Sequence, residues 1–262
     1  MISAQYPPTR STAIRPTQEQ NVNTKKAYKE DPAWIAYRNQ FASIYDEANY
    51  TSPLQSWVMR SSHKLLERPF GAEKHFNSVL EVGAGTGEHL DFIQHGYDRY
   101  LLSDMDHHTL EIAKKRHPIS TKGHIEFSVQ SGDQLSFEDN SFDRLIAAHV
   151  LEHIYQPHKM LQEWARVLKN GATMSILIPT DPGLAWRLGR HLGPRKNARA
   201  KGIPYDYIMA REHVNSCNNL IAILRHMFPG AIESWWPLPI ASIDLNLFFT
   251  FHAKITKEQH DL

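Results

Sequence analysis

Three glycines directly follow a short apolar run and form the clearest ligand-binding signal in the chain. The run Val79-Leu80-Glu81-Val82 leads into Gly83-Ala84-Gly85-Thr86-Gly87. Glycines allow a sharp backbone turn and let a ligand approach without an intervening Cβ. Dinucleotide sites have the spacing GxGxxG, whose third glycine permits close helix packing under a pyrophosphate. Here the spacing is GxGxG and Glu88 stands at that third position, which suits a ligand that has no phosphate and carries a positive charge.

Two aspartates follow the next two predicted strands. Asp104 ends the second strand and could accept hydrogen bonds from both hydroxyls of a ribose. Asp133 follows the third strand and could accept from an adenine amino group, with the Gln134 backbone N–H donating to a ring nitrogen. Each has a structural alternative alone, since Asp104 could cap the next helix and Asp133 could belong to a turn. The full predicted binding set is Glu81, Gly83, Ala84, Gly85, Gly87, Asp104, Met105, Asp133, Gln134 and His149.

Two histidines follow the fourth predicted strand and are the candidate catalytic residues. His149 comes directly after Ala147-Ala148, and His153 follows shortly after it. Histidine titrates near neutrality, so either could remove a proton from a nucleophile. His149 could instead only line the pocket, and His153 could pack against or cap the following helix.

The elements that would position these residues alternate between strands and helices. Strands are predicted over 78–82, 100–103, 125–129, 144–148 and 173–178. The helices between them are predicted near Leu90 and Ile93 with Gly96 as the stop, over 107–116, and along 160–168 with Asn170-Gly171 as the stop. This alternation predicts a parallel sheet covered by helices on both faces. A helix near 215–228 and two strand-like runs, 232–236 and 245–255, predict an antiparallel hairpin at the sheet edge.

Three regions are expected along the chain. Residues 1–30 are polar and aperiodic, which predicts a mobile N-terminal arm. Residues 31–70 are expected to form a helical cap, with Asp31-Pro32 as a helix start and a second helix from Leu54 to Leu66. The apolar face of its first helix comprises Trp34, Tyr37, Phe41, Ile44, Tyr45 and Ala48. Residues 71–262 are expected to form the ligand-binding domain, with a basic insert at about 181–212.

The composition excludes several other classes of site. The chain has 262 residues, with 29 Lys+Arg against 28 Asp+Glu and a net charge of +1, so any positive field must be local. Cys217 is the only cysteine, which excludes an intrachain disulfide and a multi-thiolate zinc site, and it is expected in the core. His107-His108 adjoin on a predicted helix and would point apart, so no metal site is expected.

The start of the chain and its apolar runs argue for a cytoplasmic protein without stable membrane insertion. Pro7 and Pro8 stand where a secretory peptide would carry an apolar run. The longest apolar stretches are too short to span a bilayer. The oligomeric state stays open.

At this point a family resemblance becomes clear. The glycine turn is followed by Ser103-Asp104-Met105-Asp106, Gly132-Asp133, Ser141-Phe142-Asp143, Val150-Leu151-Glu152-His153 and Ala165-Arg166-Val167-Leu168-Lys169-Asn170-Gly171. With these motifs, residues 79–178 resemble the class I S-adenosylmethionine-dependent methyltransferases, specifically the type 11 group. The resemblance implies a Rossmann-like α/β fold with seven strands in the order 3-2-1-4-5-7-6 and strand 7 antiparallel. It also implies S-adenosyl-L-methionine as cofactor, with the preceding helices over it.

The methyl acceptor is less well determined by the sequence. Nucleic acid is disfavoured because His149-Val150-Leu151-Glu152 replaces the Asn/Asp-Pro-Pro-aromatic box of amino-directed DNA enzymes, and because Cys217 is far from that region. A small-molecule acceptor is expected. The acceptor atom, the use of a base and the pathway stay open. The alternatives are a non-catalytic cofactor-binding scaffold and a nicotinamide-dependent oxidoreductase, and the GxGxG spacing argues against the latter.

A basic segment after the fifth strand could hold a carboxylate- or phosphate-bearing acceptor. Residues 184–201 hold six basic residues, and no acid stands between Asp181 and Asp206. Leu184, Leu188 and Leu192 share a helical face, which would dock and aim two arginines toward the cleft. The alternatives are a solvated basic surface and a weak membrane-surface contact. The predicted acceptor-binding residues are Arg187, Arg190, Tyr205, Tyr207 and His213.

Overall fold

A computed structural model describes residues 31–37, 53–118, 123–192, 194–200 and 202–257. The chain divides into two units, 1–31 and 32–262, and the description concerns the second. The helices are α2 (Pro53–Glu67), α3 (His107–Arg116), α4 (Pro157–Val167), α5 (Leu184–Leu192), α6 (Pro194–Ala200), α7 (Tyr205–Glu212) and α8 (Cys217–Met227), with 3-10 turns η1 (Glu88–Phe92) and η2 (Leu151–His153). The strands are β1 (His75–Val82), β2 (Gly96–Asp104), β3 (His124–Val129), β4 (Phe142–Ala148), β5 (Leu168–Pro179), β6 (Ile232–Trp236) and β7 (Phe248–Lys254).

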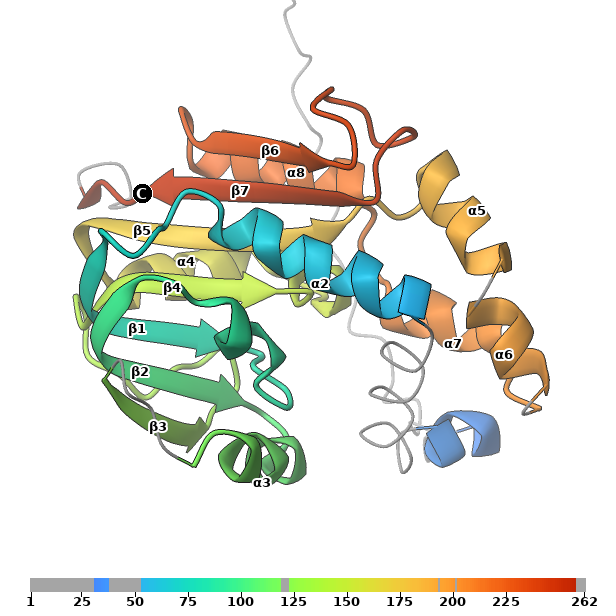
Figure 1. The fold of residues 1–262 in the computed structure, drawn as a ribbon, viewed down its shortest axis with the longest axis horizontal. Coiled ribbons are helices and arrows are strands. Elements are labelled where there is room, and N and C mark those ends of the chain that lie inside the picture. Colours follow the sequence, from blue (N-terminus) through green and yellow to red (C-terminus); the bar gives the residue numbers. More distant parts are fainter. Residues whose placement is uncertain (1–30, 38–52, 119–122, 193, 201, 258–262) are drawn as a thin grey trace, which may run out of the picture. The chain divides into compact units, whose positions relative to one another are not determined.

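The strands form one seven-stranded sheet in the order β3-β2-β1-β4-β5-β7-β6, as the resemblance implied (Figure 1). The first five are parallel, and β7 runs antiparallel to both β5 and β6. The register pairs Val82 with Ser103 and Asp104 with Val129. Because parallel strands end at the same sheet edge, this register brings the segments after β1, β2, β3 and β4 together.

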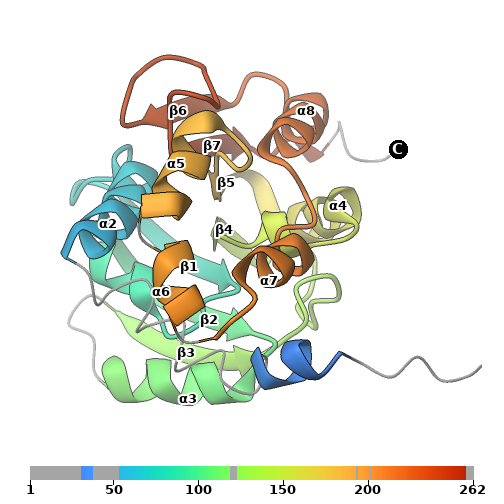
Figure 2. The ribbon, with the colours of Figure 1, turned by 90° about the vertical axis from the view of Figure 1, so that its right-hand side faces the viewer.

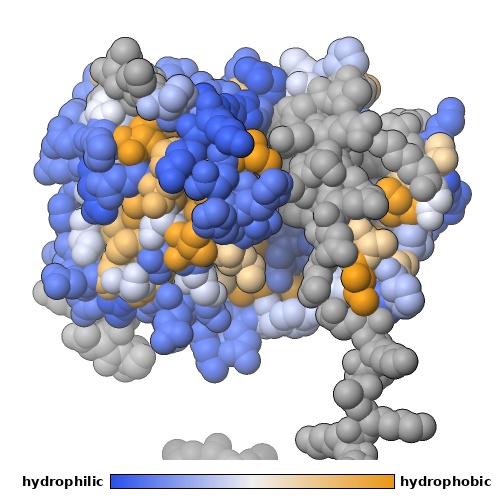
Figure 3. Space-filling model, turned by 90° about the horizontal axis from the view of Figure 1, so that it is seen from below, coloured by the Kyte–Doolittle hydropathy of each residue, from blue (hydrophilic) through white to orange (hydrophobic). Residues whose placement is uncertain are grey.

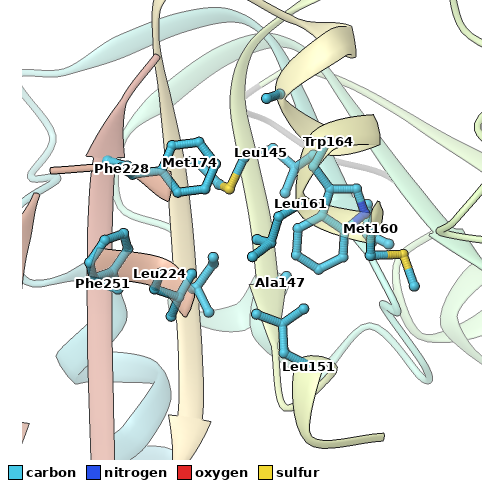
Figure 4. Close-up of a cluster of buried hydrophobic side chains, with 14 of the residues drawn as sticks. Leu145, Ala147, Leu151, Met160, Leu161, Trp164, Met174, Leu224, Phe228 and Phe251 are labelled. Atoms are coloured by element: carbon cyan, nitrogen blue, oxygen red, sulfur yellow. The ribbon is translucent and has the colours of Figure 1, made fainter. Parts of the chain in front are cut away.

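Two apolar layers cover the sheet, because successive strand side chains point to opposite faces. Leu145 and Ala147 of β4 join the cluster under α4 and α8, whereas Ile146 joins the cluster under α2 and α3. Figure 4 shows the first cluster, where Trp164 of α4 and Phe251 of β7 flank the β4 side chains. Cys217 is 1% exposed in this layer, as expected, and burial raises the pKa of its thiol to about 12.

The structure corrects two predicted helix ends. The segment after the glycine turn is only the short turn η1, and Gly96 begins β2, where it pairs with His75. α4 ends at Val167, before Asn170-Gly171, because Leu168 already pairs with Phe142 in the sheet. Sheet pairing therefore overrides the local stop signals. The short helix α7 lay outside the sequence prediction.

The N-terminal cap is described only in part. Residues 32–37 are helical after Asp31, as predicted, and α2 covers the predicted second helix. Phe41, Ile44, Tyr45 and Ala48 lie outside the described residues, as does the arm 1–30.

The distribution of polar side chains on the visible surface agrees with the layered core. Seen from the side of β3 and α3, the visible described surface is mostly hydrophilic, with separate hydrophobic spots (Figure 3). Within the described ranges, no helix has the length and apolar character that crossing a bilayer requires.

Candidate active site

A cavity of about 1230 Å³ lies at the carboxyl ends of the parallel strands. Its described lining includes eight of the ten predicted ligand-binding residues: Glu81, Gly83, Ala84, Gly85, Asp104, Met105, Asp133 and His149. Trp34, Tyr37, His63, His89, His153 and Glu212 also line it. Viewed from this edge, α5, α6 and α7 lie in front of the strand ends (Figure 2). The fold therefore brings together residues that the sequence separates by more than a hundred positions.

The glycine turn needs glycine for two separate reasons. Gly83, Gly85 and Gly87 have φ values of +67°, +52° and +76°, a region that residues with a Cβ rarely adopt. A Cβ on Gly83 would lie 2.6 Å from Val150 Cγ2, whereas a Cβ on Gly85 would meet nothing within 4 Å. Gly83 thus lets the segment after β4 approach, and Gly85 keeps open the space beside the cavity.

Asp104, the predicted ribose-binding carboxylate, lines the cavity at the carboxyl end of β2. Its Oδ2 accepts from the Gly85 N–H at 2.9 Å, and its Oδ1 accepts from the Asp106 N–H at 2.9 Å. Burial raises the pKa of this carboxyl group, and the backbone N–H donors oppose that rise. Each carboxylate oxygen can accept further hydrogen bonds. The backbone holds the group in place without exhausting its capacity as an acceptor.

Of the two predicted adenine-binding residues, only one lines the cavity. Asp133 lines the cavity, and its Oδ1 accepts from the Ser131 hydroxyl. Gln134 does not line the cavity, because its N–H donates to the Ser131 carbonyl at 3.1 Å and closes a turn. Gly87 also lies outside the lining, beside the His117 ring.

A buried carboxylate lies at the end of β1. Glu81 is 2% exposed, and the Tyr100 hydroxyl donates to its Oε2 at 2.6 Å. Burial raises the pKa of Glu81. Six carboxylates line the cavity against one lysine: Glu81, Glu88, Asp104, Asp106, Asp133 and Glu212, with Lys159. Since Glu88 is already paired with Arg116, the remaining acids carry the negative field, which favours a cationic ligand over a pyrophosphate.

The two candidate catalytic histidines both reach the cavity. His149 has a φ of +60°, an uncommon value that recurs at functional sites. Its Nε2 lies 3.2 Å from Ser62 Oγ, and its Nδ1 lies 3.6 Å from Glu152 Oε1. His153 donates from Nδ1 to the Glu212 carbonyl at 2.8 Å. Burial lowers the pKa of His153, but Glu212 and Glu152 outweigh burial and the net direction is up.

Two further histidines of the cavity, His63 and His89, lay outside the sequence prediction. His63 of α2 lies 3.0 Å from His89 between their Nδ1 atoms, and His89 Nε2 lies 2.9 Å from Glu67 Oε1. Burial and the neighbouring His89 lower the pKa of His63 well below its ordinary value. The local signal was weak, because His63 and Glu67 share a helix face but His89 comes from η1.

The predicted acceptor-binding residues do not line the cavity. Arg190 instead pairs with Asp181 at 2.5 Å and lies against the Trp186 ring. Leu184 and Leu188 are 51% and 55% exposed, so the predicted apolar face does not dock. α5 turns Trp186 inward against Phe248.

The other four predicted acceptor-binding residues also have positions outside the cavity lining. Arg187 is exposed, which fits the solvated basic surface that the sequence left open. Tyr207 is 39% exposed, and its hydroxyl accepts from Arg211. Tyr205 is half-buried, and burial raises its pKa. His213 lies behind His153, with ring centroids 5.1 Å apart.

Comparison with known proteins agrees with this geometry. Residues 80–176 match the family model described as a methyltransferase domain. A demethylmenaquinone methyltransferase from Bacteroides fragilis is 28% identical over 152 residues, covering 55% of this chain and 59% of that protein. The ubiquinone/menaquinone biosynthesis C-methyltransferase UbiE from Rickettsia felis is 30% identical over 138 residues, covering 49% of this chain and 54% of that protein. The chain therefore spans less than two thirds of the length of these relatives.

Solved structures share the fold. A SAM dependent methyltransferase from Aquifex aeolicus aligns with a TM-score of 0.53 at 18% identity, covering 82% of this chain and 98% of that chain. The N-methyltransferase NodS from Bradyrhizobium japonicum aligns with a TM-score of 0.53 at 17% identity, covering 76% and 97%.

Proposed function

Because residues 80–176 belong to the type 11 family of S-adenosylmethionine-dependent methyltransferases, we propose that the chain transfers a methyl group from S-adenosylmethionine to a small-molecule acceptor. One observation carries the proposal. Gly83 and Gly85 of the glycine turn, Asp104, Asp133 and His149 lie at the ends of four different strands and line a single cavity. Methyl transfer from a sulfonium is an in-line displacement, so a site that aligns donor and acceptor and excludes water meets its main requirements.

The residues of the cavity fit this cofactor. Gly83 and Gly85 leave the turn free of side chains, and Asp104 offers unused acceptor capacity for two ribose hydroxyls. The excess of carboxylates suits a cationic sulfonium and an amino group. When bound, the cofactor supplies an electrophilic methyl group. The cavity of about 1230 Å³ exceeds the roughly 300–1,000 Å³ of common ligand pockets, which leaves room for an acceptor.

The acceptor would bind on the histidine side of the cavity. His149 and His153 are proposed to take a proton from an acceptor that carries one at working pH. An anionic group on the acceptor stays part of the proposal, although Arg190 is already paired with Asp181. The relatives are named for demethylmenaquinone and for ubiquinone and menaquinone biosynthesis, so quinone-type compounds belong in any acceptor screen. A cytoplasmic location remains a prediction.

The test combines cofactor binding with transfer of a labelled methyl group. Calorimetry should show binding of S-adenosylmethionine, and incubation with methyl-labelled cofactor and a metabolite extract should label a small molecule. Gly83→Val is the matched inactive variant, because its side chain would collide with Val150. Cofactor binding without labelling of any compound would favour the non-catalytic scaffold. Binding of NADH in place of S-adenosylmethionine would overturn the proposal and favour the oxidoreductase.

A further inference from the structure

A cluster of metal-ligating side chains reaches the cavity through one of its members and lies apart from the glycine turn. It comprises Glu152 and His153 of η2 and His213, which directly follows α7. One ligand atom from each residue lies within 4.8 Å of the others. His153 also lines the cavity, so an ion held here would face the same space as the acceptor.

Both histidines have an oxygen acceptor at Nδ1, which leaves Nε2 available for a metal ion. His213 Nδ1 lies 2.7 Å from Asp181 Oδ2. His153 Nδ1 lies 2.8 Å from the Glu212 carbonyl oxygen and 3.2 Å from Glu212 Oε2. These oxygens accept, so each Nδ1 carries a proton, and in the neutral ring the lone pair is then on Nε2. Carboxylate and carbonyl partners on the distal nitrogen are typical of metal-binding histidines.

The contact of Arg190 with His213 does not change the proton assignment of the His213 ring. Its Nη2 lies 3.2 Å from His213 Nδ1, but a guanidinium can only donate. Both groups therefore donate to the same Asp181 oxygen, which Arg190 approaches at 2.5 Å. In the described part of the chain, no hydrogen bond engages Nε2 of His153 or of His213.

Glu152 is a second, independent indication of a cation-binding site. The residue is 2% exposed. Its Oε1 lies 3.6 Å from His149 Nδ1 and 4.0 Å from His153 Nε2, whereas its Oε2 is buried without a hydrogen-bond partner in the described structure. An unpartnered carboxylate oxygen in the interior is costly unless a cation binds it.

We propose that Glu152, His153 and His213 bind one divalent transition-metal ion of the zinc or iron(II) class. Two imidazole nitrogens and one carboxylate oxygen suit these ions, and a fourth position stays open at catalytic sites. Ligand atoms at about 2.1 Å from a tetrahedral ion are about 3.4 Å apart. Glu152 Oε1 and His153 Nε2 are 4.0 Å apart and all three ligand atoms lie within 4.8 Å of one another, so binding requires side-chain shifts of about 0.5–1.5 Å. The sequence did not predict this site because its ligands come from two distant segments.

The role of the ion rests on the proposed methyl transfer. An ion at this wall would bind an oxygen of the acceptor, such as a carboxylate, phenolate or hydroxyl group. As a Lewis acid it would lower the pKa of a bound hydroxyl and hold the anion for attack on the methyl group. It would thus provide the anion receptor that Arg187 and Arg190 do not provide in this cavity. As a ligand, His153 would not serve as a base, which leaves His149 in that role.

The test measures metal binding directly, without methyl transfer. The full chain is treated with a chelator, dialysed and titrated with Zn²⁺ by calorimetry, and with Co²⁺ by visible absorption, which reports coordination geometry. We expect one equivalent to bind, and Glu152→Gln and His213→Ala to weaken binding by about 10–100-fold or more. His158→Ala is the matched control, because His158 is exposed on α4 and outside the cluster, and it should bind normally.

The variants must also be shown to be folded. Circular dichroism and S-adenosylmethionine affinity should be close to wild type, and His213→Gln replaces His213→Ala if the latter does not fold. The proposal is overturned if no stoichiometric binding occurs, or if folded variants of Glu152 and His213 bind as well as wild type. Failure of the wild-type chain to bind S-adenosylmethionine would instead count against the proposed function, so the two failures can be distinguished.

Discussion

At the scale of single residues, Asp104 has both a structural and a proposed binding role. Its two oxygens accept from the Gly85 and Asp106 N–H groups, which sets the distance between the glycine turn and the start of α3. The same oxygens retain capacity for ligand hydroxyls. A substitution here should therefore affect affinity more than folding, because the backbone donors can bind water at the cavity surface instead.

We predict that Asp104→Ala weakens S-adenosylmethionine binding by about 30–150-fold, since two charge-assisted hydrogen bonds are worth roughly 2–3 kcal/mol. Calorimetry measures the change. Asp98→Ala is the control, because Asp98 is exposed at the other end of β2. Unchanged affinity in Asp104→Ala would refute the ribose assignment.

At the scale of elements, a buried ion pair attaches α2 to the sheet. Arg144 of β4 is 0% exposed, and its guanidinium donates to both oxygens of Glu67 at 2.9 and 2.6 Å. Leu65 and Leu66 of α2 are buried beside the pair. Since α2 also carries His63 into the cavity, this attachment positions part of the site.

Removing one partner of that pair should be strongly destabilising. Arg144→Leu leaves the Glu67 carboxylate buried without its cation, and we expect a loss of about 3–5 kcal/mol in the free energy of unfolding. Urea denaturation measures it. Arg225→Ala breaks an exposed pair with Glu233 and should cost at most about 1 kcal/mol. Adding Glu67→Leu to Arg144→Leu should recover much of the loss, and a double variant as unstable as the single one would contradict this account.

The short N-terminal helix is predicted to cover the cofactor. Trp34 and Tyr37 line the cavity, and the Arg211 guanidinium lies over the Trp34 ring at 4.0 Å. We expect Trp34→Ala to weaken S-adenosylmethionine binding by about 5–10-fold, equivalent to roughly 1 kcal/mol of lost contact. Deletion of residues 1–25 should leave affinity unchanged. If Trp34→Ala binds like wild type, residues 31–37 do not act as a cap.

At the scale of the whole molecule, several buried histidines make stability depend on pH. Burial and the nearby Arg144 lower the pKa of His252 to about 3 and of His95 to about 4. In the unfolded chain these side chains titrate near 6.5. Unfolding at lower pH therefore takes up protons, and the folded state loses stability as the pH falls.

The pH window follows from these values. The contribution of His252 and His95 should be fully present above about pH 6.5 and be lost progressively as the pH falls toward 4 and 3. Glu67 adds to the loss of folding stability at more acidic pH. Burial raises its pKa, but Arg144 and His89 outweigh burial and hold the pKa below its usual range. Urea unfolding at pH 7.5, 6 and 5 should show declining stability, with a shallower decline in His252→Leu. Identical slopes for the two proteins would contradict the role of His252.

The sequence by itself determined the strands and most of the predicted residues that line the cavity at their ends, because local patterns encode both. Apolar runs that end in glycine or aspartate predict where strands end, and parallel pairing then requires those ends to meet. Tertiary structure decided what depends on contacts between distant segments. Sheet pairing ended α4 at Val167. An ion pair with Asp181 neutralised Arg190, and core packing turned Trp186 inward while Leu184 stayed exposed. Tertiary structure also placed His213 beside Glu152 and His153. No periodicity in the sequence encodes this proximity, because it depends on which distant segments the packing of the core brings together.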